Sequence, residues 1–297
     1  MKKLLFFSVI CLFVYHTFSQ SSVSMEEVVR YLASPELEGR KTGTKGDSLA
    51  LTYLVNQFEK MDIKPFLDQY EAIPYYAYSK KWELWSKNVI AFVEGTDSVL
   101  KGQYILVCAH FDHLGIKKEA LYPGANDNAS GTATVLYLAD YFAKNPTKKS
   151  IIFACFSGEE LGLLGSKCFV KFLPKLLPNI QCVVNFDMVG RYDQGGIRIL
   201  GKNLSKLLNE TVKKTSEKEQ IKTKQSHVAF MRSDQHSFYQ QKIPFLCFNT
   251  GNDLKNYHTP KDDADKIDFK GMVIVAKFAA QIVQELGNEP KKPILNF

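Results

Sequence analysis

The stretch from Cys108 to Gly131, CAHFDHLGIKKEALYPGANDNASG, places a histidine and two aspartates just beyond a short apolar run. That run, residues 104–109 (YILVCA), is rich in β-forming residues, as expected for a strand that is buried on both faces of a sheet. His110 therefore leaves the strand at its carboxyl end, and Asp112 and Asp127 follow in loops. Ligands of open α/β sheets bind beyond the carboxyl ends of strands, so this stretch predicts a metal site.

Three later segments repeat this arrangement, in which an apolar run leads directly into polar residues. If these strands lie in one sheet with the first, four strands deliver acids and histidines to one rim. The segments are residues 151–156 ahead of Glu159 and Glu160, residues 182–186 ahead of Asp187, and residues 244–248 ahead of a loop that reaches Tyr257 and His258.

Length and composition favour one large α/β domain, residues 21–297. The chain has 297 residues, of which 45% are hydrophobic, which is enough to bury a sizeable core. Neither an internal repeat nor a long linker divides it. Ser24 and Glu27 form a capping box ahead of one helix, and a second amphipathic segment ends near Met61, so we expect an N-terminal helical lead-in.

Residues 1–20 have the features of an export signal. Two lysines precede an apolar stretch from Leu4 to Tyr15, and Thr17 and Ser19 are small residues ahead of a cleavage site. The apolar stretch is too short to span a bilayer comfortably. The signal predicts a periplasmic or secreted protein without a stable membrane span. Cys11 lacks a preceding glycine or alanine, so a lipoprotein anchor is the weaker alternative.

The charge balance is mildly basic, with 38 lysines and arginines against 31 acidic residues. The basic residues form no block interleaved with aromatic ones, so the sequence shows no nucleic-acid-binding surface. Of the six cysteines, the five beyond the predicted signal lie mostly in predicted core strands. We expect small buried thiols there rather than a disulfide framework.

The residues predicted to meet at the rim suit zinc. Zinc takes imidazole and carboxylate ligands, and two zinc ions about 3.5 to 4 Å apart can clamp the oxygens of a hydrolysis when a carboxylate bridges them. Glu159 and Glu160 are adjacent and face different directions, so one can bind metal while the other remains free as a base. Such pairs are usually solvated surface charge, but this pair follows a buried strand.

Five blocks carry these residues in order: His110-Phe-Asp112, Gly124 to Gly131, Ser157 to Ser166, Asn185 to Met188, and Tyr257-His258. Together they resemble the motif blocks of metallopeptidase family twenty-eight, the co-catalytic di-zinc aminopeptidases. Residues 31–64, with LASPELEGRKTGTKG, resemble the start of that family's domain. The resemblance implies a three-layer α/β/α fold with a central, mostly parallel mixed sheet, of the zinc-dependent exopeptidase type.

The resemblance also implies the ligands of two zinc ions. His110 and Asp187 would hold one ion, Glu160 and His258 would hold the other, and Asp127 would bridge them. The family further places a cis peptide bond directly after the bridging aspartate.

The remaining roles that the resemblance implies belong to residues beside the metals. Glu159 would be the general base for a water held between the zinc ions. Asp112 would accept the second ring N–H of His110 and so orient that ring. The hydroxyl of Tyr257 would stabilise the developing oxyanion.

Several polar residues near these motifs remain without a catalytic assignment. His113 is expected to line the rim rather than to bind metal. Arg232, Ser233 and Asp234 resemble a family segment that flanks the substrate pocket, and their spacing assigns no individual role. His236 is expected to have a surface or packing role.

The predicted function is an exported zinc aminopeptidase that cleaves the first residue from peptides with a free N-terminus. A dipeptidase or a carboxypeptidase-type relative is the alternative among peptidases. Glutaminyl cyclases share the fold but use one zinc ion and a different ligand set. A non-catalytic binding module would lack ligands or the base, all of which are present here. The sequence does not set the oligomeric state.

Overall fold

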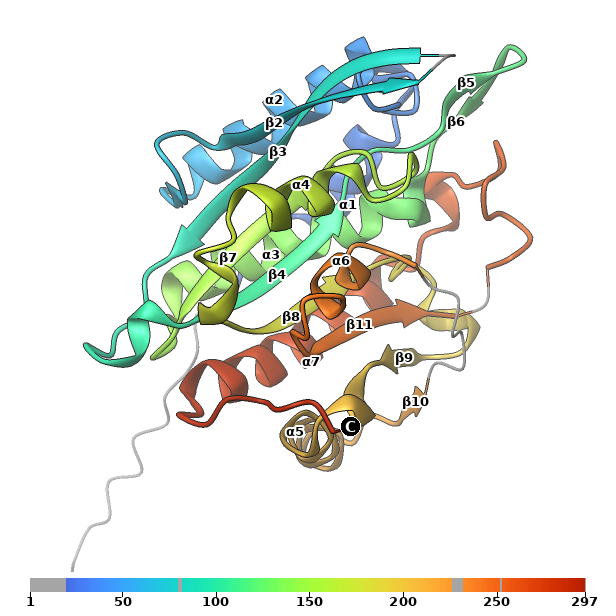
Figure 1. Cartoon of the computed structure of the whole chain (residues 1–297). Helices are drawn as coiled ribbons and strands as arrows, with labels where there is room; N and C mark the ends of the chain where they lie inside the picture. The colour runs from blue at the N-terminus through green and yellow to red at the C-terminus, as the bar shows by residue number, and fades with distance from the viewer. Residues whose placement is uncertain (1–19, 80–81, 226–231, 252, 297) are drawn as a thin grey trace, which may run out of the picture.

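The computed structural model describes residues 20–79, 82–225, 232–251 and 253–296 (Figure 1). The predicted export signal lies outside the described residues, apart from Gln20. The main helices are α1 (Met25–Leu32), α2 (Lys45–Lys60), α3 (Gly131–Lys144), α4 (Leu164–Phe172), α5 (Lys206–Lys218), α6 (Gln235–Tyr239) and α7 (Phe269–Asn288). The strands are β1 (Lys64–Pro65), β2 (Glu71–Ser79), β3 (Trp82–Val93), β4 (Tyr104–His110), β5 (Gly115–Lys117), β6 (Ala120–Tyr122), β7 (Ser150–Phe156), β8 (Ile180–Phe186), β9 (Ile197–Leu200), β10 (Thr223–Gln225) and β11 (Phe245–Thr250).

Nine strands of the described chain form one mixed sheet. Their order is β1-β3-β7-β4-β8-β11-β9-β10, and β2 pairs with β3. The central strands β7, β4, β8 and β11 are parallel, whereas β3 and β9 join them antiparallel. The predicted α/β class with a mixed sheet is confirmed. Because the central strands are parallel, their carboxyl ends meet at one edge, as the sequence indicated.

The sheet is buried on both faces, which explains why its strands are apolar throughout. Ile105 and Val107 of β4 pack in one core, and Leu106 and Cys108 pack in the other. Helices α1, α2, α3, α5 and α7 contribute to the first core, and α4 and α6 contribute to the second (Figure 1). These are the three expected layers. The five cysteines of the described chain are free, and four of them are buried.

The N-terminal helices form where the sequence placed them. The Ser24 hydroxyl accepts the Glu27 N–H at 3.3 Å at the start of α1, and Leu51, Leu54 and Phe58 of α2 are buried. None of the described helices is both long and apolar enough to cross a bilayer.

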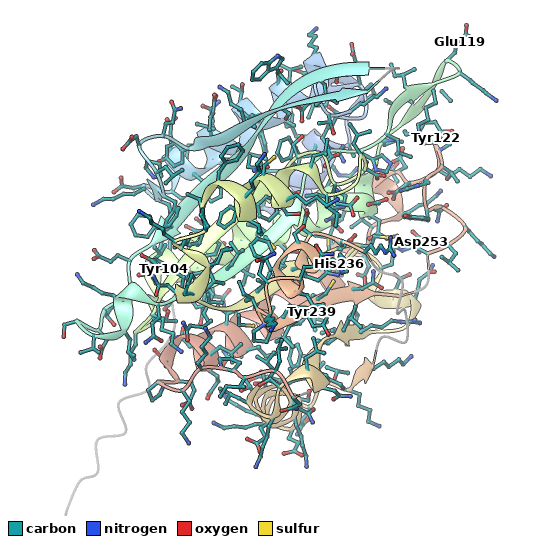
Figure 2. All side chains as sticks on the ribbon, viewed as in Figure 1. Tyr104, Glu119, Tyr122, His236, Tyr239 and Asp253 are labelled. Carbon is teal, nitrogen blue, oxygen red and sulfur yellow. The ribbon has the colours of Figure 1, made fainter. Side chains whose placement is uncertain are left out.

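Three local features do not follow from the sequence pattern. Helix α4 begins only at Leu164, because Gly162 and Leu163 have φ angles of 99° and 64°, outside the helical region. Residues 116–123 lie largely in the β5–β6 hairpin, whose turn carries Glu119 at its tip (Figure 2). Strand β9 was not predicted, because its four residues are too short for a clear periodicity.

The packing of α2 generates a test of the lead-in. A Cβ at Gly46 would lie 1.8 Å from the backbone oxygen of Leu37, so the two segments cannot keep this approach if Gly46 carries a side chain. We expect Gly46→Ala to destabilise the protein by about 1 to 3 kcal/mol, although alanine favours helices. Differential scanning calorimetry should show a Tm lowered by roughly 2 to 10 °C.

Gly102→Ala is the matched control, since a Cβ there meets nothing within 4 Å. Equal melting temperatures for the two variants would contradict the close approach of Leu37 and α2.

Candidate metal centre

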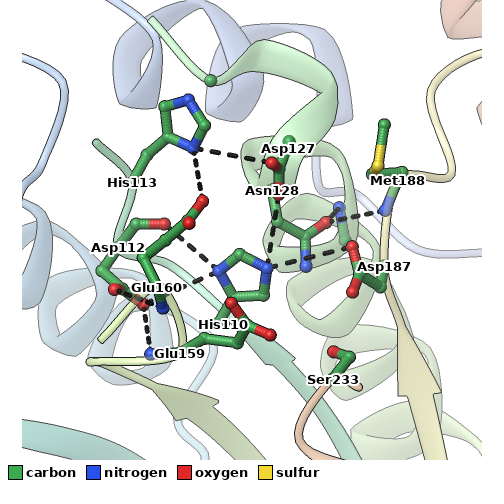
Figure 3. Close-up of polar contacts among 12 residues, drawn as sticks. His110, Asp112, His113, Asp127, Asn128, Glu159, Glu160, Asp187, Met188 and Ser233 are labelled. Atoms are coloured by element: carbon green, nitrogen blue, oxygen red, sulfur yellow. Dashed lines mark hydrogen bonds and ion pairs between the residues drawn. The ribbon is translucent and has the colours of Figure 1, made fainter. Parts of the chain in front are cut away.

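The carboxyl ends of β4, β7 and β8 bring a first group of ligand-type residues together (Figure 3). His110 is the last residue of β4, Glu159 follows β7, and Asp187 comes directly after β8. One donor atom from each of these residues lies within 4.8 Å of the other two. We call these three residues the first cluster.

A second cluster lies beside the first and consists of His113, Asp127, Glu160 and His258. Donor atoms of the first three lie within 4.8 Å of one another. The Nε2 of His258 is 3.1 Å from Asp127 Oδ2 and 3.2 Å from Glu160 Oε1. The structure thus gathers all five predicted ligands.

Asp127 faces both clusters with different oxygens. Its Oδ1 lies 3.5 Å from Nε2 of His110, and its Oδ2 lies 3.1 Å from Nε2 of His258. The peptide bond from Asp127 to Asn128 is cis, as the family resemblance implied. A carboxylate in this position can serve two ions at once.

Several buried atoms of the second cluster are unsatisfied in a way that fits a cation. Among the residues that the structure describes, no hydrogen-bond partner of acceptable geometry reaches Asp127 Oδ2, Glu160 Oε1 or either ring nitrogen of His113. Leaving a buried polar atom unpaired costs about 1 to 3 kcal/mol, and more for a charged one. Imidazole and carboxylate donors are the set that zinc takes in proteins, so the residues present fit zinc.

His113 lies deeper than expected. Its side chain is fully buried, with Nδ1 3.1 Å from Glu160 Oε1, so the expectation that it lines the rim is wrong. Its backbone N–H donates to the carbonyl of Arg40 at 3.2 Å, and this bond draws the loop inward. Sequence spacing could not show this contact because Arg40 belongs to the distant lead-in.

Asp112 organises the loop that carries both glutamates. Its carboxylate accepts the backbone N–H of Glu159 at 3.1 Å and that of Glu160 at 3.3 Å, and it accepts the Thr42 hydroxyl at 2.8 Å. The Nδ1 of His110 lies 3.6 Å from Asp112 Oδ1 and 3.2 Å from the Asp112 backbone oxygen. The residue thus lies beside His110 as expected, but the nearer acceptor is its backbone.

Arg40 is a structural residue to which sequence reasoning gave no role. Its buried guanidinium donates to the backbone oxygens of Leu32, Phe111, Pro123 and Gly124. Leu32 belongs to α1, Phe111 follows His110, and Pro123 and Gly124 precede Asp127. The Arg40 side chain therefore connects the N-terminal lead-in to the loops that carry His110 and Asp127. Burial lowers the pKa of Arg40 to about 10, against the opposing charges of nearby carboxylates. The sequence offered one indication of this role, because Arg40 lies within residues 31–64, the segment that resembles the start of the family's domain.

Asp262 was also missed, although it follows His258 by four residues. It is buried, and its two oxygens accept the backbone N–H groups of Asn126 and Asp127, each at 2.9 Å. Burial raises the pKa of Asp262 to about 6. The carboxylate fixes the loop that presents the bridging aspartate.

The two adjacent glutamates have opposite electrostatic environments. Burial raises the pKa of Glu159 to about 10, despite the nearby charge of His110. Burial also acts on Glu160, but contacts from His113 and His258 outweigh it and hold the pKa of Glu160 below its usual value. The neighbours therefore differ in chemistry, as expected if one binds metal and the other moves a proton.

A cavity of about 280 Å³ opens over the clusters and is lined in part by Glu159, Asp187, Tyr257 and Arg232. The Tyr257 ring is 42% exposed and stacks on His258 with 3.8 Å between centroids. Tyr257 thus lies on the cavity wall, and the predicted role in oxyanion stabilisation requires this position.

The other unassigned residues divide between cavity and core. Arg232 is exposed and borders the cavity, whereas Asp234 is fully buried. His236 is half-buried and lines a smaller neighbouring depression together with Tyr257. Only Arg232, of these three residues, can reach a ligand in the main cavity.

Comparison with known proteins links this geometry to a family. The sequence model of "Peptidase family M28" matches residues 88–283. Aminopeptidase YwaD of Bacillus subtilis (strain 168) is 28% identical over 278 residues, which cover 88% of this chain and 55% of YwaD. The chain therefore spans about half the length of this curated relative.

Solved structures share the fold at lower identity. An aminopeptidase from Aneurinibacillus sp. strain AM-1 superposes with a TM-score of 0.73 at 18% identity, over 92% of this chain and 95% of that one. A glutaminyl cyclase from Porphyromonas gingivalis also gives a TM-score of 0.73, at 17% identity, over 90% of this chain and 99% of that one. Both likenesses concern the fold.

The clusters predict how zinc occupancy responds to each glutamate. We expect the dialysed protein to hold about two zinc ions per chain, in keeping with a bridged pair. Glu160→Gln should weaken zinc binding at the second cluster, because a neutral amide is a poorer zinc donor than a carboxylate. Glu159→Gln should retain both ions. Metal analysis and zinc titration calorimetry measure these occupancies.

Zinc should also raise the Tm, because it binds only the folded protein. At a zinc concentration a thousandfold above Kd, this binding adds about 4 kcal/mol to the free energy of unfolding. Saturation of the wild-type protein at one ion, or loss of zinc from Glu159→Gln rather than Glu160→Gln, would overturn the scheme.

Proposed function

The chain belongs to peptidase family M28, and from that membership we propose that it is a zinc-dependent aminopeptidase that removes the first residue of peptides. The observation that carries the proposal is the position of Asp127, whose two oxygens face separate clusters containing His110 and His258. This arrangement supports a pair of zinc ions rather than one. Peptides with a free N-terminus are the proposed substrates.

The protein's own residues supply the proton transfers. Zinc ions bound at the two clusters would polarise the scissile carbonyl and lower the pKa of the attacking water. Glu159 borders the cavity, accepts a proton from that water and returns it to the leaving amine. Tyr257, on the same wall, donates its hydroxyl proton in a hydrogen bond to the developing oxyanion.

The cavity also explains why the proposed cleavage occurs at chain ends. Asp187 lines it, and its carboxylate attracts the ammonium of a peptide's first residue. A volume of about 280 Å³ lies just below the usual range for small-molecule sites, roughly 300 to 1,000 Å³. A cavity of this size suits the end of a peptide chain.

Glutaminyl cyclase chemistry is the second candidate, because a solved cyclase superposes as closely as the aminopeptidase does. A cyclase releases ammonia from an N-terminal glutamine and leaves the peptide bonds intact. The two reactions therefore give products of different mass.

A peptide panel tests the proposed function. The zinc-loaded protein should shorten free peptides by one residue from the N-terminus and leave their acetylated forms intact, as followed by mass spectrometry. A peptide that begins with glutamine should lose that whole residue rather than ammonia alone.

Glu159→Gln serves as the control for contaminating peptidases, and we expect its turnover to fall by about a hundredfold to ten-thousandfold. Ammonia loss without cleavage would favour the cyclase, and cleavage of acetylated peptides would contradict the aminopeptidase.

We further propose that the protein is exported. Support comes from two lysines, the apolar stretch from Leu4 to Tyr15, and the small residues Thr17 and Ser19. The mature chain should begin near Gln20 or Ser21, which amino-terminal sequencing of native material can establish. An intact Met1 in a cytoplasmic fraction would refute export.

A further inference from the structure

The cavity over the metal clusters extends along the sheet edge to a strand that plays no part in the metal centre. Asn249, at the end of β11, donates its side-chain N–H to the backbone oxygen of Asp187 at 2.8 Å. Arg198 of β9 is the register partner of Asn249 and lines the same cavity. Since adjacent strands lie about 4.8 Å apart, the backbone of Arg198 is roughly 10 Å from that of Asp187.

Arg191 and Arg198 differ in their ion-pair partners. Arg191 is held by Asp193 and Asp253, each at 3.3 Å, so the carboxylate of Asp253, labelled in Figure 2, is already neutralised. Within the described residues, no carboxylate lies within 4.0 Å of Arg198. Its Nε is buried and has no hydrogen-bond partner in the described part of the chain.

Further positive charge surrounds Arg198. Lys224 of β10 is its register partner on the other side, and a Cβ built on Gly195 would lie 3.7 Å from Arg198 Nη2 and 3.8 Å from Lys224 Nζ. The end of the cavity remote from the zinc ligands is therefore cationic.

We propose that Arg198 is a specificity-determining residue that binds a carboxylate of the peptide substrate, so that acidic peptides are preferred. The inference rests on the proposed aminopeptidase function. A guanidinium presents a planar fork that pairs with a carboxylate through two parallel hydrogen bonds, and Arg198 lines the cavity with no carboxylate of the described residues paired to it. The side chain of Arg198 and an acidic substrate side chain, placed end to end, span the distance of roughly 10 Å between the backbones of Arg198 and Asp187.

The carboxylate can come from the side chain of the first or of the second substrate residue. Two pairs of amidated peptides separate these sources: Glu-Ala-Ala against Gln-Ala-Ala, and Ala-Glu-Ala against Ala-Gln-Ala. Glutamate and glutamine have the same length, so the ratio of kcat/KM within a pair reports the charge. We expect one pair to favour glutamate by about tenfold to a hundredfold, as for a charge-assisted hydrogen bond.

Substitutions then assign the preference to Arg198. Arg198→Gln should bring the favoured ratio close to one, and Arg198→Lys should retain part of it. Lys222→Gln is the matched control, because it removes the same charge from an exposed residue that does not line the cavity. Its ratio should equal that of the wild-type protein, and a preference retained in Arg198→Gln would overturn the assignment.

Calorimetry of free glutamate and glutamine binding to the zinc-loaded protein gives a second readout. The wild-type protein should bind glutamate more tightly, and Arg198→Gln should bind the two equally. Ratios near one at both positions, with alanine peptides still cleaved, would refute the carboxylate site and leave the aminopeptidase standing. If no peptide is cleaved, the proposed function fails, and equal binding of the two amino acids by the wild-type protein would refute the site as well.

Discussion

The neutralisation of buried negative charge is the constraint on which the site depends. Asp112, Asp127, Asp187 and Asp262 are all buried at the carboxyl edge of the sheet. An uncompensated buried carboxylate costs several kcal/mol, so each needs a partner. Asp112 and Asp262 are satisfied by backbone N–H groups, whereas Asp127 faces histidines on both sides. The first pair therefore shapes the loops, and Asp127 remains available to a cation.

The N-terminal lead-in provides the opposite charge and the rigidity. Arg40 reaches four backbone oxygens around the metal loops, and Thr42 donates to Asp112. Asp47, in the first turn of α2, accepts a hydrogen bond from the hydroxyl of Ser157 at 2.8 Å, and Ser157 lies two residues before Glu159. A segment without a predicted ligand thus holds three of the loops that carry the predicted ligands, which is how a precise donor geometry is maintained on loops.

The residues proposed for catalysis and the residue proposed for substrate specificity lie on different strands at the same edge of the sheet. The parallel strands β4, β7 and β8 end in the donor residues, and the antiparallel strand β9 begins beside them with Arg198. One cavity joins the two regions. Because β9 runs in the opposite direction, its first residues rather than its last lie at this edge, so it contributes a cationic wall without adding a donor to the clusters.

The sequence by itself determined the fold class, the four central strands and the residues gathered at their ends. It could do so because fully apolar strands and the polar residues that follow them are local patterns. The tertiary structure alone decided the burial of His113, the roles of Arg40 and Asp262, and the place of Arg198. Each of these depends on contacts between segments far apart in the chain, such as Arg40 with Gly124 or Asp262 with Asn126. Local periodicity carries no information about which distant backbone atoms a side chain will meet, and a four-residue strand such as β9 is too short to show a period at all.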